Sequence, residues 1–84
     1  MRHARAAALD ELEPLLESLR ALPGLRERSR GVFYRGSTAF LHFHEDPSGF
    51  HADVRLGGTF ERFRAQTQKE RAALLQRIEK ALTA

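Results

Sequence analysis

The sequence predicts an α+β protein, a two-layer sandwich of helix, four-strand antiparallel meander and helix, with both helices on one face of the sheet. Two leucine-rich segments near the ends of the 84-residue chain have the three- and four-residue spacing of amphipathic helices. Between them, apolar and polar residues alternate and glycine-containing turns interrupt the pattern, which is typical of antiparallel strands. We expect residues 1–84 to form a single domain without repeats or linkers.

The first helix is expected over residues 10–22. Its apolar stripe consists of Leu12, Leu15, Leu16, Leu19 and Leu22. If Asp10 is the N-cap and Glu13 its capping-box partner, Pro14 falls in the first turn, where its missing N–H has little effect. The alternative is a longer helix from about residue 4 with a kink. Pro23-Gly24 ends the helix in either case.

A polar connector follows, with arginines at Arg26, Arg28 and Arg30. Two strands are then expected over residues 31–35 and 38–45, joined by a two-residue turn at Gly36-Ser37. Continuing the pairing away from this turn places Phe33 opposite Phe40 and Val32 opposite Leu41.

A second hairpin turns at Asp46-Pro47-Ser48-Gly49 and leads into a strand over residues 50–56. A four-residue turn pairs His42 with Asp53 and His44 with His51, which separates apolar from polar faces cleanly. A glycine bulge would instead pair His42 with Val54 and mix the two faces, so we favour the first register.

After Gly57-Gly58, residues 60–65 can form a fourth strand, although a short helical turn is an alternative because Phe60 and Phe63 fall on opposite strand faces. The last helix is expected over residues 68–82. Thr67 and Glu70 have the spacing of a capping box at its start.

Composition excludes several classes of protein. The chain has no cysteine, which rules out disulfides, thiol catalysis and thiolate metal sites. No apolar run is long enough for a signal peptide or a membrane span, so we expect a cytoplasmic protein with no membrane segment. A chain this short has little room for an enclosed active site, and neither a nucleophile elbow nor a phosphate loop is present. We therefore expect a non-enzymatic binding or interaction module of unknown ligand.

Alternation assigns the strand residues to two faces. The face expected to pack against the helices carries Val32, Tyr34, Leu41, Phe43, Ala52, Val54 and Leu56. The opposite face is the expected ligand or interface surface and carries Phe33, Phe40, His42, His44, His51, Asp53 and Arg55.

A zinc site is one interpretation of that surface. His42 and His44 point to the same side of one strand, and His51 and Asp53 lie opposite them on the next. Imidazole nitrogens and a carboxylate oxygen form a ligand set that zinc accepts. His3 is expected in a frayed terminus, outside the site.

Two other interpretations use different residues. Of the 14 basic residues, 12 are arginine, the better phosphate ligand, although the net charge is only +3. The connector arginines could contact nucleic acid together with Arg62 and Arg64. Alternatively, Phe33 and Phe40 could be buried in a homodimer formed through the exposed sheet face.

The layout and the phrase Leu22-Pro23-Gly24-Leu25 resemble small uncharacterised bacterial proteins of the YjbR/MmcQ kind. The resemblance covers most of the chain and implies a frataxin-like arrangement, with both helices on one side of the sheet. It also implies DNA binding by a double-wing surface. This chain is shorter and carries His-Phe-His-Glu-Asp and His-Ala-Asp in addition, and the resemblance assigns no functional residue.

Overall fold

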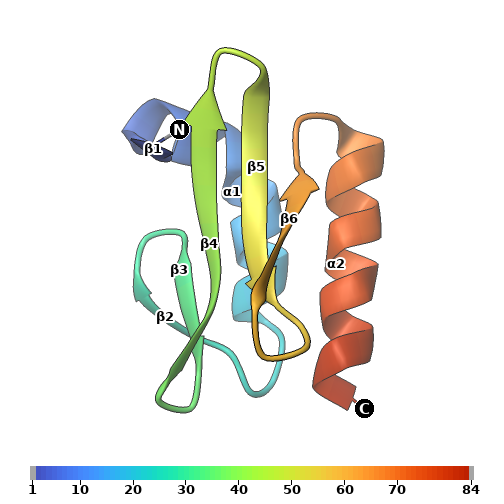
Figure 1. Ribbon diagram of the computed structural model, residues 1–84. Coiled ribbons are helices and arrows are strands. Elements are labelled where there is room, and N and C mark those ends of the chain that lie inside the picture. The colour runs from blue at the N-terminus through green and yellow to red at the C-terminus, as the bar shows by residue number, and fades with distance from the viewer. Residues whose placement is uncertain (1, 84) are drawn as a thin grey trace.

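The computed structural model describes residues 2–83, apart from the side chain of Arg2, and has the predicted α+β fold (Figure 1). The elements, in chain order, are β1 (Arg2–His3), α1 (Ala6–Arg20), β2 (Arg26–Ser29), β3 (Val32–Arg35), β4 (Thr38–Asp46), β5 (Gly49–Arg55), β6 (Phe60–Arg64) and α2 (Gln68–Thr83).

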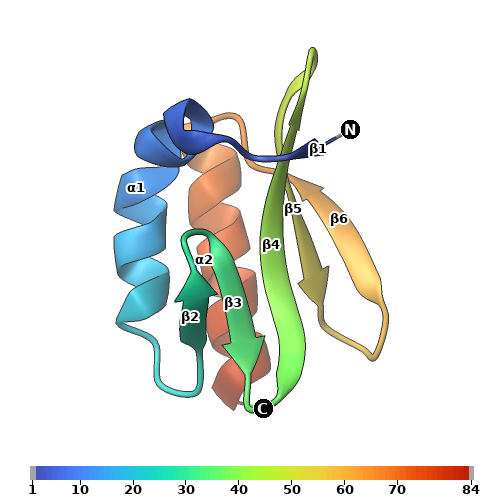
Figure 2. The ribbon, with the colours of Figure 1, turned by 90° about the vertical axis from the view of Figure 1, so that its left-hand side faces the viewer.

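All strands belong to one antiparallel sheet with the order β2-β3-β4-β5-β6. The short β1 pairs with the far end of β4, beyond the part that pairs with β3. Figure 2 shows α1 and α2 together on one side of the sheet, so the opposite face of β4, β5 and β6 carries no helix. The predicted meander is confirmed, and two further strands extend it.

Helix α1 begins earlier than residue 10, because the run Ala6-Ala7-Ala8 has high helix propensity and continues the helix toward the N-terminus. The capping prediction for Asp10 was therefore wrong. Pro14 lies inside the helix, and it is exposed to solvent. The carboxylates of Asp10 and Glu13 instead accept hydrogen bonds from Arg30, at 2.7 and 2.8 Å.

The expected polar connector is largely an edge strand, β2. Glu27 pairs with Phe33, and its carboxylate accepts a hydrogen bond of 2.9 Å from the backbone N–H of Gly31. Gly31 has a φ of +80°, and an added Cβ would lie 2.7 Å from a methyl carbon of Leu9. Edge strands tolerate charged side chains, so β2 has no apolar alternation that could indicate it.

A β-bulge in the first hairpin changes which side chains face the helices. Arg35 pairs with Thr38 and Tyr34 with Ala39, as expected for these neighbours of the turn, but Phe33 pairs with Leu41. Phe40 is the extra residue, and beyond it the strand faces are exchanged. Phe33 and Phe40 are consequently 0% and 3% exposed and belong to the core, so the prediction that they lie on the exposed face was wrong.

The core lies between the helices and the covered face of the sheet. Its largest fully buried side chains are Phe33, Leu12, Leu16, Leu19, Leu41, Ile78 and Val54. Helix α2 starts with the predicted capping box, in which Glu70 N–H donates to Thr67 Oγ1 at 3.1 Å and Thr67 N–H donates to Glu70 Oε1 at 2.9 Å. No helix within residues 2–83 is long and apolar enough to cross a membrane.

Candidate metal centre

The β4–β5 hairpin has the register that the sequence predicted. Leu41 pairs with Val54, His42 with Asp53, and His44 with His51. Since paired residues share a face, the histidines and Asp53 lie on the side of the sheet away from the helices. The alternative register with a glycine bulge is excluded.

Strand β1 brings a further histidine to this face. His3 pairs with His44, and the adjacent Ala4 N–H donates to the Phe43 carbonyl at 3.1 Å. The Arg5 N–H donates to the Glu45 carboxylate at 2.7 Å. These contacts hold β1 on the sheet, so the expectation that His3 belongs to a frayed terminus was wrong.

His3, His42 and His44 form one cluster, which we call the three-histidine cluster. One ring nitrogen from each lies within 4.8 Å of the other two. The centroid of the His44 ring is 4.7 Å from that of His42 and 4.8 Å from that of His3. Tetrahedral zinc with Zn–N bonds of 2.0–2.1 Å needs ligand nitrogens about 3.3 Å apart. The two ring nitrogens that lie farthest apart would therefore have to move about 1.5 Å closer to bind one ion.

His42 is a partly buried member of the cluster. Phe60 packs edge-on against its ring, with the centroids 4.8 Å apart, and its Nδ1 is buried without a hydrogen-bond partner in the described part of the chain. Burial lowers the pKa of His42, and the neighbouring His44 lowers it further. The ring therefore favours the neutral form, which is the form that binds metals.

His51, which the sequence placed among the metal ligands, lies apart from the three-histidine cluster. Its Nε2 is 3.2 Å from Ser48 Oγ and 3.4 Å from Asp46 Oδ1. A hydrogen bond from the Ser48 hydroxyl is the largest of the effects that lower the pKa of Asp46, to about 2. Serine and aspartate both face the same ring nitrogen, whereas a catalytic triad needs them on opposite nitrogens. This group is therefore a hairpin-tip contact.

Asp53 is buried beside the cluster. Arg62 on β6 donates two hydrogen bonds to its carboxylate, at 2.8 and 2.9 Å, and these are the main reason that the pKa of Asp53 is lowered. Its Oδ2 also lies 3.1 Å from Nε2 of His44. Sequence reasoning placed Asp53 on the correct face but not in contact with Arg62.

Most of the candidate arginines are bound within the protein. Arg55 donates to the carbonyls of Ala39 and Gly58, at 2.9 and 2.7 Å, and its guanidinium lies over the Phe60 ring. Arg64 donates to the Ser48 carbonyl at 3.0 Å. The guanidinium of Arg28 lies 4.3 Å from the Tyr34 ring centroid, and Arg26 is exposed on the edge strand β2.

The described residues offer little apolar surface for a dimer on this face. With Phe33 and Phe40 in the core, the exposed large hydrophobic side chain is Phe60, at 38%. Arg55 partly covers that ring. The apolar patch that suggested a homodimer is therefore not formed.

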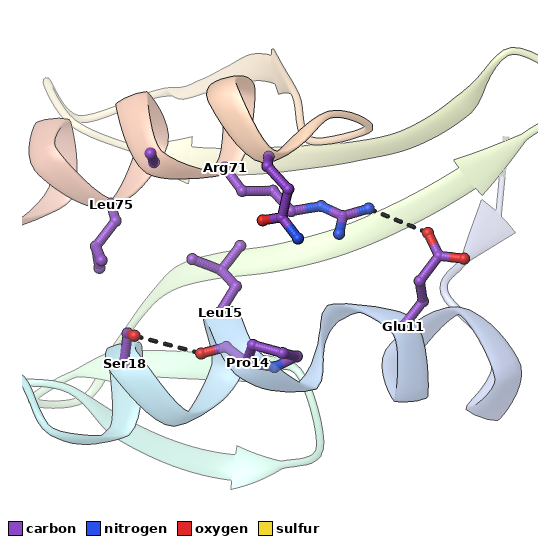
Figure 3. Close-up of a pocket in the computed structure, with 8 residues that line it drawn as sticks. Glu11, Pro14, Leu15, Ser18, Arg71 and Leu75 are labelled. Carbon is purple, nitrogen blue, oxygen red and sulfur yellow. Dashed lines mark hydrogen bonds and ion pairs between the residues drawn. The ribbon is translucent and has the colours of Figure 1, made fainter.

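A separate cleft of about 180 Å³ lies between α1 and α2 (Figure 3). Arg71 lines it and is only 8% exposed. Its guanidinium donates to the carbonyls of Ala65 and Gln66, at 2.8 and 2.9 Å, and to Glu11 at 3.1 Å. These bonds join the start of α2 to α1, which explains the buried arginine as a packing element.

Comparison with known proteins adds no assignment. No family model, curated sequence or solved structure matches this chain.

Proposed function

We propose that this protein binds a divalent transition-metal ion of the zinc class through His3, His42 and His44. The proposal is carried by one observation, the convergence of three imidazole nitrogens within 4.8 Å of one another. The rings come from β1 and β4, two strands that are paired in the sheet.

The chemistry of the donors favours some metals over others. Imidazole suits zinc, copper and nickel, whereas magnesium and calcium prefer oxygen ligands. Burial that lowers the pKa of His42 reduces the competition from protons at neutral pH. A metal bonded to Nδ1 of His42 would also supply a partner to that buried nitrogen.

Three protein ligands leave a coordination position open. The cluster lies on the sheet face that carries no helix, and His3 is exposed. An open position on such a face suits reversible binding of an ion or of a ligand carried by it, in keeping with a non-enzymatic binding module.

Isothermal titration calorimetry with zinc chloride at pH 7.5 tests this function. We expect binding of one ion by the unaltered protein, and an affinity at least about tenfold lower for His42→Ala and for His3→Ala, because each removes a ligand. His51→Ala is the matched control, since that ring lies outside the three-histidine cluster, and its affinity should be unchanged.

A titration without binding to the unaltered protein would refute the proposal. Equal losses in His51→Ala and His42→Ala would instead indicate that the ligands are those of the β4–β5 hairpin. Magnesium chloride, titrated in the same way, should give no binding.

A further inference from the structure

Among the described residues, two aspartate–histidine contacts lie on the sheet face that carries no helix, and they differ in the position of the histidine. Asp53 Oδ2 is 3.1 Å from Nε2 of His44, and the two side chains are only 11% and 12% exposed. Asp46 Oδ1 is 3.4 Å from Nε2 of His51. Only His44 belongs to the three-histidine cluster.

We propose that Asp53 is a positioning residue of the metal centre, which acts on the ion through His44 and is itself held in place by Arg62. This inference rests on the proposed function and deepens it. It changes the role that the sequence suggested for Asp53, from a direct oxygen ligand to a group one step removed from the metal.

The electrostatics of a bound ion support this role. A metal-bound imidazole carries part of the positive charge of the ion, so a carboxylate 3.1 Å away stabilises the bound state more than the free state. The effect is strong here because the Asp53 side chain is largely screened from water. Arg62 makes two hydrogen bonds to the carboxylate and so fixes the direction in which it faces.

The contact also selects the nitrogen that binds. Nε2 of His44 is the nitrogen that lies 3.1 Å from the Asp53 carboxylate, so a hydrogen bond formed there would leave Nδ1 as the ring nitrogen for the metal. The proposed arrangement thus runs from Arg62 to Asp53, to His44 and to the ion.

Asp53→Asn and Asp46→Asn make a matched pair of variants for the test. Each replaces a carboxylate beside a histidine with an amide of nearly the same shape. We expect the zinc affinity to fall about 10- to 100-fold in Asp53→Asn, the range for loss of an outer partner of a ligand, and to stay unchanged in Asp46→Asn. Urea unfolding of both metal-free variants measures any purely structural effect separately.

A spectroscopic readout distinguishes positioning from stability. Long-range proton–nitrogen NMR of the zinc-bound unaltered protein should show His44 bound through Nδ1, with a mixture of Nδ1 and Nε2 binding in Asp53→Asn. This measurement on the unaltered protein is decisive even if Asp53→Asn does not fold, because binding through Nε2 would overturn the inference.

The outcomes separate the two proposals. If the unaltered protein binds zinc and Asp53→Asn binds it equally well, the positioning role is refuted while the metal site stands. If both aspartate variants lose affinity equally, the effect is one of general charge and the positioning role is again refuted. If the unaltered protein binds no zinc, both proposals fail.

Discussion

Phe33 and Phe60 lie on the same sheet in opposite environments. The Phe33 side chain is fully buried against the helices, whereas Phe60 is 38% exposed beside His42. We expect Phe33→Ala to lower the free energy of unfolding by about 3–5 kcal/mol, because it removes a buried ring and leaves a cavity. Phe60→Ala should cost about 1 kcal/mol or less. Urea denaturation of both variants checks this, and equal losses would contradict the bulged register of β3 and β4.

At the scale of single residues, the candidate site could be predicted only in part. His42, His44 and Asp53 could be placed on one face because strand alternation is a local property of the chain. The separation of His51 from the cluster could not, since it depends on a side-chain contact with Ser48 at the hairpin tip. The pairing of Asp53 with Arg62 required the register of β6, which the imperfect alternation of its phenylalanines left open.

The capping box of α2 gives a prediction at the scale of one element. Thr67 Oγ1 accepts a hydrogen bond from a backbone N–H in the first turn, which no carbonyl of the helix can satisfy. Thr67→Ala should therefore lower the free energy of unfolding by about 1 kcal/mol. Thr83→Ala, at the opposite end of α2, is the control and should change it little. A larger loss in the control, measured by urea denaturation, would contradict this account.

Elements with a strong local signal were predicted well, and those without one were not. The β4–β5 hairpin and the start of α2 carry their own turn and cap residues, so their positions followed from the sequence. The bulge at Phe40 was missed because Phe40 and Leu41 are both apolar, and an apolar pattern does not say which residue is the extra one. Strand β2 was missed because it has no apolar alternation. Its place in the sheet is given by its pairing with β3, which the sequence does not show.

Acid should destabilise the whole molecule. The pKa values of five carboxyl groups in the described chain are lowered, namely Glu13, Glu27, Asp46, Asp53 and Glu70. A lowered folded-state pKa means that the unfolded chain binds protons more readily. These carboxylates therefore contribute their full stabilisation above about pH 4.5, and this stabilisation is lost as the pH falls through their folded-state pKa values. For Asp46 that loss extends to about pH 2.

Urea unfolding at pH 5 and at pH 2.5 measures this effect. We expect a clear fall in the free energy of unfolding between the two values, and a smaller fall in Asp46→Asn, which lacks one of the titrating groups. An unchanged free energy of unfolding at pH 2.5 would show that these carboxylates gain nothing on folding.

At the scale of the whole molecule, the α+β class and the arrangement of helices on one face followed from the distribution of apolar residues along the chain. The presence of β1 in the sheet could not be predicted in this way. Two residues carry no periodicity, and the pairing joins the start of the chain to its middle. The expectation of nucleic-acid binding and the resemblance to YjbR/MmcQ-like proteins stay predictions.

The short strand β1 has a consequence for the kinetics of the fold. Its two residues meet β4 only after a long stretch of chain has been closed into a loop, which is entropically unfavourable. We expect such a contact to form late in folding, in which case an ion held by His3 and β4 would stabilise the native state without stabilising the folding transition state. Bound metal would then lower the rate of unfolding and leave the rate of folding unchanged.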